Sequence, residues 1–341
     1  MFTVIIPVHN KRPHLVRCLE SLRAQTEVPW EAIAVDDASD DGSIEILQDY
    51  SRQLPLRLFS RSTPGPGGYA ARNLAIAHAR GEWLTFLDAD DAWEPGYLAE
   101  IARLQHLFPQ AAVLGTGYRL IDSDHEQINR FTRNVSRQEE APAARLIDVP
   151  TFLESYIYAG GCFQTSATAV RRDILLQAGG FPEGRARQGG DVDTWLRCML
   201  LARCGAWSPS IRVRYHRDAT NRVTADPANL HDPHPVAVTV TQWLTRLEDS
   251  SERDLLRRFG AKKGLKRMRD AARAGIMNRR ILSTLTLAGT RGWLQLVLLL
   301  PTFLWHSALG ANRRATQHTT ATATPKSSPK EQSEEMPRRD D

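Results

Sequence analysis

The 341-residue sequence lacks several features that identify whole classes of protein. Its four cysteines, Cys18, Cys162, Cys198 and Cys204, form no Cys-x-x-Cys pair and have no zinc-like spacing. This argues against a disulfide framework or a structural zinc site and indicates buried thiols in a reducing compartment. Neither the Walker nor the Rossmann glycine pattern occurs, so those two phosphate-binding fingerprints are absent.

A large excess of one charge is also missing, since 44 Lys and Arg face 39 Asp and Glu, for a net charge of +5. The basic residues are nevertheless crowded between positions 253 and 280, which indicates a local anionic partner such as lipid or nucleic acid. No nucleic-acid-binding motif accompanies them, so nucleic acid is not expected. No basic segment precedes the apolar start, so we expect no signal peptide and a cytoplasmic protein.

Long uninterrupted apolar runs are absent too. The longest candidate, residues 293–309, is short for a bilayer span and is interrupted by polar residues and Pro301. We expect residues 253–310 to attach the protein to the cytosolic membrane face, with basic side chains on anionic headgroups and shallow insertion of the apolar run. The alternative is a helical hairpin packed on the rest of the chain. Residues 311–341 have the composition of a disordered tail.

The first ninety residues alternate between apolar strands and amphipathic helices. Strands are expected at 2–8, 30–35, 56–59 and 83–87, with helices between them, which predicts a parallel α/β sheet. Asp40 or Asp41 is expected to cap the second helix. Later strands are expected at 111–118, 165–170 and 211–215, and helices at 97–108 and from 191, whereas 122–148 looks polar and irregular. We expect a catalytic domain at 1–225, a basic helical extension at 226–310 and the tail at 311–341.

Polar residues gather where the predicted parallel strands end, at His9-Asn10, Asp36-Asp37 and Asp88-Ala-Asp90-Asp91. In open α/β sheets the ligand lies beyond the carboxyl ends of the strands. A carboxylate cluster is costly to bury without a counter-charge, and hard oxygen ligands suit Mg²⁺ or Mn²⁺ arriving with a phosphate-bearing substrate. The alternative is a solvated acidic turn.

Each remaining motif allows a functional and a structural interpretation. Asp37 can accept hydrogen bonds from a base imide or a ribose hydroxyl, or belong to a capping turn. The glycine-rich loop 64–68 followed by Arg72 can approach a diphosphate, or be a flexible loop. Asp191 can act as a general base, or decorate a helix start. His216 can bind metal or phosphate, or be a hydrogen-bonded structural histidine.

Taken together, six segments in this order resemble family 2 glycosyltransferases with the GT-A fold, over roughly residues 2–220. The segments are Val4-Ile-Ile-Pro-Val-His-Asn10, Ala34-Val-Asp-Asp-Ala-Ser-Asp-Asp-Gly-Ser43, Gly68-Tyr-Ala-Ala-Arg-Asn73, Phe86-Leu-Asp-Ala-Asp-Asp91, Gly179-Gly-Phe-Pro-Glu183 and Gly190-Asp-Val-Asp-Thr-Trp195. The family usually has an aromatic residue in place of His9, and often Glu-Asp in place of Gly190-Asp191. The Gln-x-x-Arg-Trp signature of processive synthases is absent, which favours a nonprocessive enzyme.

The resemblance implies a role for each matching residue. The residues implied to line the nucleotide-sugar pocket are Pro7, Val8, His9, Asn10, Asp37, Gly68, Arg72, Asp88 and Ala89. Asp37 would contact a uracil-type base and Arg72 would lie near the diphosphate. Asp88 and Asp90 would hold the ribose and the metal, and Asp191 would be the catalytic base. Apart from the resemblance, His216 is a further candidate metal ligand.

These implications add up to inverting, metal-dependent transfer of one sugar from a nucleoside-diphosphate sugar, a UDP-sugar being favoured, to a glycan or lipid-linked acceptor. Two other functions stay open. A nucleotidyltransferase that makes nucleotide sugars would carry a glycine-rich loop with a lysine directly after the first strand, where this chain has Pro7-Val-His-Asn. A non-catalytic sugar-nucleotide-binding protein would have no need for both Asp90 and Asp191.

Overall fold

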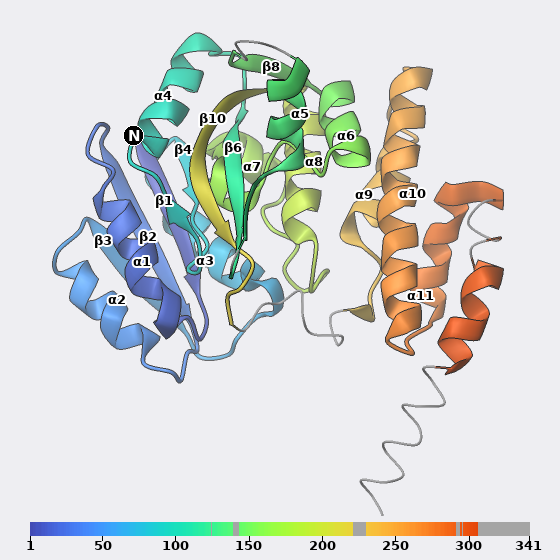
Figure 1. Ribbon diagram of the computed structural model, residues 1–341, viewed down its shortest axis with the longest axis horizontal. Helices are drawn as coiled ribbons and strands as arrows, with labels where there is room; N and C mark the ends of the chain where they lie inside the picture. Colours follow the sequence, from blue (N-terminus) through green and yellow to red (C-terminus); the bar gives the residue numbers. More distant parts are fainter. Residues whose placement is uncertain (124, 139–142, 221–229, 291–293, 295, 306–341) are drawn as a thin grey trace, which may run out of the picture.

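The computed structural model describes residues 1–123, 125–138, 143–220, 230–290, 294 and 296–305. Its centre is a ten-stranded mixed sheet with helices on both faces (Figure 1). The strand order is β3-β2-β1-β4-β9-β6-β10-β5, with β7 paired to β6 and β8 paired to β10. The strands are β1 Phe2–Val8, β2 Trp30–Asp37, β3 Leu56–Arg61, β4 Trp83–Phe86, β5 Ala92–Trp93, β6 Val113–Asp122, β7 His125–Ile128, β8 Arg145–Asp148, β9 Thr168–Arg171 and β10 Cys204–His216.

The four strands of the first ninety residues are parallel, as the alternation of strands and helices predicts. In the register, Phe2 of β1 lies opposite Trp30 of β2 and Trp83 of β4, and β2 pairs with β3 in the same direction. Because β1, β2 and β4 all run the same way, their carboxyl ends meet at one edge of the sheet. Polar residues that follow these strands are thereby brought together.

The later strands make the sheet mixed rather than parallel. β9 runs antiparallel to both β4 and β6, and β7, β8 and β5 are antiparallel to their partners, while β10 is parallel to β6. Parallel neighbours need a crossover of about a dozen residues or more, and β7 follows β6 too closely for one. The segment expected to be a strand from Thr165 begins instead as a 3₁₀ turn, Thr165–Ala167, and only then enters β9.

The helices form two layers, because successive strand side chains point to opposite faces. Val4 and Ile6 of β1 belong to one hydrophobic core and Ile5 to the other. The first core contains side chains of α1 Arg12–Arg23, α2 Ser43–Ser51 and α4 Tyr97–Leu107. The second contains side chains of α3 Tyr69–His78, α6 Val149–Tyr158, α7 Arg172–Gln177 and α8 Gly190–Ala202.

The C-terminal helices continue the second layer on one side of the sheet (Figure 1). Val236 and Val240 of α9 Pro235–Trp243, with Leu256 and Phe259 of α10 Ser250–Arg273, are buried in the same core as α6 and α8. A separate small cluster joins α10 to α11 Arg279–Leu282 and the 3₁₀ segment Ser283–Ala288. The predicted domain boundary at residue 225 and the predicted tail 311–341 lie outside the described residues.

Two local expectations differ from the structure. The stretch expected to be irregular at 122–148 contains β7, α5 Arg130–Gln138 and β8, because pairing to β6 and β10 overrides its polar composition. The residue before α2 is Gly42, with a left-handed φ of 86°, and its side chain cannot cap. Asp41 instead accepts hydrogen bonds from the backbone and hydroxyl of Ser43 at 3.0 and 2.6 Å.

Candidate active site

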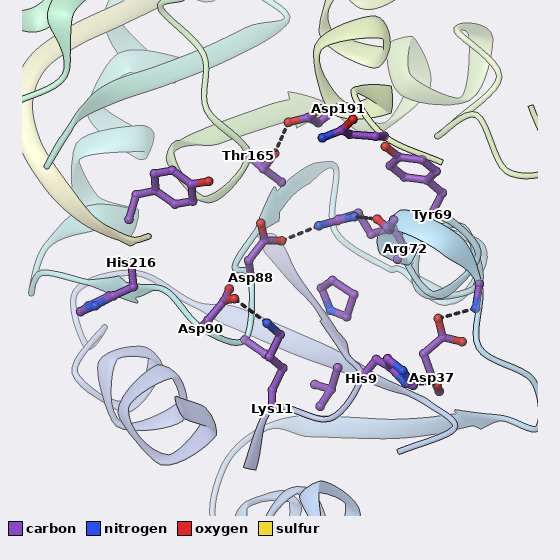
Figure 2. Close-up of a pocket in the computed structure, with 18 of the residues that line it drawn as sticks. His9, Lys11, Asp37, Tyr69, Arg72, Asp88, Asp90, Thr165, Asp191 and His216 are labelled. Atoms are coloured by element: carbon purple, nitrogen blue, oxygen red, sulfur yellow. Dashed lines mark hydrogen bonds and ion pairs between the residues drawn. The ribbon is translucent and has the colours of Figure 1, made fainter. Parts of the chain in front are cut away.

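A cavity of about 300 Å³ opens where β1, β2 and β4 end. Residues from distant parts of the chain meet around it, as Figure 2 shows. Among its lining are all the residues predicted from the sequence except Asn10, namely Pro7, Val8, His9, Asp37, Gly68, Arg72, Asp88, Ala89, Asp90, Asp191 and His216. The structure therefore gathers these positions, while the role of each stays a prediction.

Asn10 does not line the cavity. Its backbone has a φ of 52°, its Oδ1 accepts the Asp40 N–H at 2.9 Å and its N–H donates to Ser39 Oγ at 3.0 Å. These bonds tie the end of β1 to the turn between β2 and α2. Asn10 thus positions the neighbouring His9 rather than forming the cavity wall.

Asp37 ends β2 and is almost completely buried at 1% exposure. Its Oδ2 accepts the backbone N–H of Gly65 at 3.0 Å, and its other oxygen pairs with Arg61. His9 Nδ1 lies 2.8 Å from the Asp37 carbonyl oxygen. A buried carboxylate with hydrogen bonds from its own chain is held in one orientation, which suits recognition of a ligand's donor groups.

Arg72 of α3 forms a buried ion pair with Asp88, which follows β4 (Figure 2). The guanidinium also donates to the carbonyl of Gly67 at 2.8 Å, and it lies 5.3 Å above the Phe181 ring. Burial raises the pKa of Asp88, the charge of Arg72 opposes that rise, and the nearby Asp90 adds to it. The glycine-rich loop is therefore fastened to the acidic strand end through one arginine.

Asp90 is paired with Lys11, whose Nζ lies 2.7 Å from its Oδ2. The same ammonium donates to the carbonyl of Thr220 at 2.8 Å, and Arg17 donates to the Asp90 carbonyl at 2.6 Å. Lysine and arginine thus supply the counter-charges that a cluster of carboxylates requires.

Asp91, the third acid of the motif, turns away from the cavity. It is fully buried, with one oxygen accepting the backbone N–H of His216 at 2.9 Å and the other accepting the Ser166 hydroxyl. Burial, together with the charges of Asp90 and Asp88, holds the pKa of Asp91 well above its usual range. Asp91 therefore fixes the end of β10 against the strand end after β4.

The two acids at the start of α8 have different surroundings. Asp191 lines the cavity, and its Oδ2 accepts the Thr165 hydroxyl at 3.2 Å. Asp193 is 3% exposed and points into the core, where its Oδ2 accepts from Arg197 Nε at 2.9 Å. The Gly190 N–H donates to the Tyr69 hydroxyl at 2.7 Å, which fixes the helix start against α3. Of the two acids, only Asp191 can reach a molecule in the cavity.

The predicted metal ligands Asp88, Asp90 and His216 share this cavity but are not assembled as a ligand set. Among the described residues, no group of three His, Cys, Asp or Glu side chains is placed to hold a metal ion. Arg72 pairs with Asp88, and Lys11 pairs with Asp90. Burial lowers the pKa of His216. Neither ring nitrogen has a hydrogen-bond partner in the described part of the chain, and Nδ1 lies 3.5 Å from Asp218 Oδ1. A neutral imidazole with an orphaned nitrogen beside Asp90 fits a divalent cation, provided that Lys11 moves away.

Several cavity residues were not predicted from the sequence. Lys11 directly follows the predicted strand-end pair and could have been found by the same strand-end argument, and Tyr215 precedes His216 on β10. Gln164, Thr165 and Gln188 also line the cavity, but they lie in turns that no sequence pattern marks. The hydrogen bond from Thr165 to Asp191 joins one of these turns to the start of α8.

Comparison with known families gives an independent view of this site. The profile described as Glycosyl transferase family 2 matches residues 3–172. An uncharacterised glycosyltransferase of Nostoc is 30% identical over 178 residues, covering 51% of this chain and 51% of that protein. The chain spans about half the length of the curated relatives it matches.

Solved structures show the same fold. Staphylococcus aureus TarS in complex with UDP-GlcNAc superposes with a TM-score of 0.65 and 19% identity, over 85% of this chain and 82% of the other. The mannosyltransferase PcManGT from Pyrobaculum calidifontis, in complex with GDP-Man and Mn²⁺, gives a TM-score of 0.54 and 19% identity over 90% and 83%. The predicted GT-A architecture with a helical C-terminal region is thereby confirmed.

Proposed function

The chain belongs to glycosyltransferase family 2, and we propose that it transfers one sugar from a nucleoside-diphosphate sugar to a hydroxyl of a glycan or lipid-linked acceptor, with inversion. The proposal depends chiefly on one observation: Asp37, the Arg72–Asp88 pair, Asp90 and Asp191 line one cavity at the carboxyl ends of parallel strands. A UDP-sugar is the favoured donor, in keeping with the UDP-GlcNAc bound by TarS. We also propose a role in cell-envelope polysaccharide synthesis, since TarS is described as a poly(ribitol-phosphate) beta-N-acetylglucosaminyltransferase and is 34% identical to this chain over 92 residues.

The donor half of the cavity is formed by the ends of β1 and β2 with the loop before α3. Asp37 has a fixed carboxylate for the base, and His9 is held beside it through the Asp37 carbonyl. Gly67 and Gly68 have φ values of 73° and 65°, so the backbone turns tightly next to Arg72. Glycine lets a backbone approach a ligand closely, and the arginine offers charge to a diphosphate.

The acceptor half contains Asp191. As the acceptor hydroxyl attacks the anomeric carbon, its proton passes to the Asp191 carboxylate while the bond from that carbon to the diphosphate oxygen breaks. The electron pair of that bond leaves with the nucleoside diphosphate. Attack from the face opposite the leaving group inverts the anomeric centre. The Thr165 hydroxyl donates to Oδ2 of Asp191 and so helps to hold this carboxylate at the cavity wall.

A divalent cation, Mg²⁺ or Mn²⁺, fits this chemistry because it would neutralise charge on the departing diphosphate. Asp90 and His216 are the residues that would hold it, with Asp88 nearby. Lys11 would leave Asp90 and become available to the diphosphate.

Donor binding provides the first test. Thermal unfolding of the full-length protein should be measured with UDP-, GDP- and dTDP-sugars, each with Mn²⁺ and with EDTA. We expect stabilisation by one donor class that is smaller in EDTA, and slow donor hydrolysis as a sign of turnover. A protein that no nucleotide sugar stabilises would contradict the proposal, while stabilisation without hydrolysis or transfer would indicate the non-catalytic alternative.

We also propose that the C-terminal helices bind the cytosolic face of a membrane. Five apolar side chains in residues 294 and 296–305 are each at least 60% exposed: Leu294 (62%), Val297 (60%), Leu298 (67%), Leu304 (62%) and Trp305 (67%). Leu296 and Leu299 pack on the cluster around Met268 and Ile281. In the part of the chain described here, no helix has both the length and the apolarity to cross a bilayer.

Exposed cations lie on the helices beside this apolar face, including Arg269, Arg273, Arg279 and Arg280. An apolar face next to basic side chains is typical of interfacial binding to anionic lipid. Co-sedimentation with phosphatidylglycerol vesicles should therefore exceed that with phosphatidylcholine vesicles, and Leu298→Ser with Trp305→Ser should abolish it. Leu107→Ser on α4 changes another exposed leucine (50% exposed) and should have no effect on vesicle binding. Equal losses of vesicle binding from the two sets of changes would refute the attachment site.

A further inference from the structure

Three basic side chains, one on α5 and two on α10, form a positively charged group near the end of α6. Arg130 begins α5, and Lys262 and Lys263 are consecutive residues of α10. No carboxylate in the described ranges forms an ion pair with any of the three. Arg130 lies close enough to Lys262 to affect its protonation. The pKa of Lys262 is lowered first by burial and then by the positive charge of Arg130.

Other basic residues of α10 differ in this respect. Arg258 pairs with Asp254 at 2.7 Å, and Lys266 pairs with Asp270 at 2.7 Å, both within one helical turn. These pairs face solvent. Lys263 instead is half-buried, with its ammonium 5.2 Å from the centre of the Tyr156 ring and 5.5 Å from that of Phe259. Aromatic faces compensate an ammonium only partly, so the site has a residual positive charge.

A short series of contacts connects Lys263 with the proposed base. The Tyr156 hydroxyl donates to the carbonyl of Phe163, two residues before Thr165, and Thr165 donates to Asp191 at 3.2 Å. Lys262 donates to the Tyr156 carbonyl at 3.2 Å and so fixes the end of α6 on the same side. In agreement with this proximity, the charge of Asp191 partly opposes the lowering of the Lys263 pKa by burial.

We infer that Lys263, together with Lys262 and Arg130, forms a subsite for the anionic group of the acceptor. This rests on the proposed function, because it places the acceptor hydroxyl at Asp191 and a phosphate or carboxylate of the same acceptor near the three cations. A half-buried ammonium without a counter-ion is costly, and a bound anion supplies the missing charge. The acceptor class is therefore a glycan or lipid-linked glycan bearing an acidic group next to the accepting hydroxyl.

Binding of a small phosphate ester tests the subsite. The full-length protein is first saturated with UDP, which fills the donor half, and is then titrated with glycerol 3-phosphate or with glycerol by ligand-observed NMR. We expect saturable binding of glycerol 3-phosphate only. Lys263→Met should weaken it by about tenfold, the usual effect of losing one charge-assisted contact, and Lys263→Arg should preserve it. Lys266→Met is the matched control on the same helix and should leave it unchanged.

Each outcome separates the possibilities. Equal binding of glycerol 3-phosphate by the wild type and Lys263→Met, or equal binding of glycerol and its phosphate, would overturn the subsite. Loss of phosphatidylglycerol-vesicle binding in Lys263→Met with unchanged glycerol 3-phosphate affinity would assign Lys263 to the membrane face and also overturn it. A protein that fails to bind UDP would refute the proposed function itself, and the UDP affinity of each variant is measured separately for that reason.

Discussion

Asp191 and Asp193 are two carboxylates on the first turn of α8, and replacing each should have a different effect. Asp191 faces the cavity with one hydrogen bond, from Thr165. Asp193 faces the core, bonded to Arg197 and Thr239. Asp191→Asn keeps the shape of the side chain and removes its ability to take a proton. Asp193→Ala removes the counter-charge of Arg197, which is only 8% exposed.

The expected magnitudes follow from these surroundings. Loss of a general base lowers the rate by about 10²- to 10⁴-fold, which corresponds to about 3–5 kcal/mol of activation free energy. Asp191→Asn should not change the free energy of unfolding by more than about 1 kcal/mol, since it removes no buried ion pair. Asp193→Ala should lower the unfolding free energy by about 3–5 kcal/mol, because it leaves the Arg197 charge buried and unpaired.

The assay combines single-turnover transfer, UDP affinity by calorimetry and urea unfolding for the wild type and both variants. Asp191→Asn should bind UDP normally and unfold normally while transfer falls. Asp193→Ala should unfold at lower urea, and its folded fraction should retain transfer. Normal turnover in Asp191→Asn would show that this carboxylate is not the base, and a stable, inactive Asp193→Ala would show that the two acids have been assigned the wrong way round.

Three further predictions concern the cavity and the proposed anion subsite. Arg72→Met should lower the unfolding free energy by about 3 kcal/mol, since Asp88 loses its counter-charge, and should weaken UDP-sugar binding by at least about tenfold. Urea unfolding measures the first effect and calorimetry the second, and an unchanged affinity would exclude Arg72 from the diphosphate site. Gly67→Ala should lower the unfolding free energy by about 1–2 kcal/mol from its left-handed backbone alone. UDP affinity should fall as well, because the new Cβ would lie 2.6 Å from the Tyr69 ring and 2.9 Å from the Arg187 carbonyl oxygen. Gly184→Ala, also left-handed but in open space, is the control that separates backbone strain from these contacts. Burial lowers the pKa of Lys263 from 10.5 to about 8, and the charge of Asp191 partly opposes this shift. The affinity for glycerol 3-phosphate should therefore fall as the pH rises through about 8 and the ammonium loses its proton, and Lys263→Arg should abolish this pH dependence. Between pH 8 and 10.5 the free energy of unfolding should rise with pH, because the unfolded chain holds the proton that the folded chain has lost.

Much of the donor half could be predicted because local sequence determines it. The apolar runs that form β1, β2 and β4 are short and well bounded, and parallel pairing brings their polar ends together regardless of what lies between them. Asp37, Asp88 and Asp90 therefore followed from strand position alone. Asn10 is not among the residues that line the cavity, because its left-handed backbone directs the side chain to the neighbouring turn, which strand periodicity does not indicate. Its predicted part in nucleotide-sugar binding stays a prediction.

The acceptor half was less accessible from sequence. Thr165 lies in a 3₁₀ turn before an antiparallel strand, and Lys263 belongs to a helix almost a hundred residues further along the chain. The ion pairs of Arg72 with Asp88 and of Lys11 with Asp90 also join segments that have no local relation. Long-range contacts of this kind depend on the assembled packing of two layers, for which a single sequence gives no direct signal.

The contacts of α10 with the rest of the chain limit where two related sequences can be joined. Arg203 reaches it through a pair with Glu252, the end of α6 meets it at Lys262, and Arg267 donates from it to the Gln188 carbonyl at 3.2 Å, within the loop that leads to Asp191. A chimera that joins one relative's N-terminal half to another's C-terminal half, in order to exchange acceptor preference, would separate the partners of all three contacts. Chimeras that keep α10 together with loop 187–190 of the same protein, and place the junction after Arg273, should preserve the position of the proposed base relative to the donor.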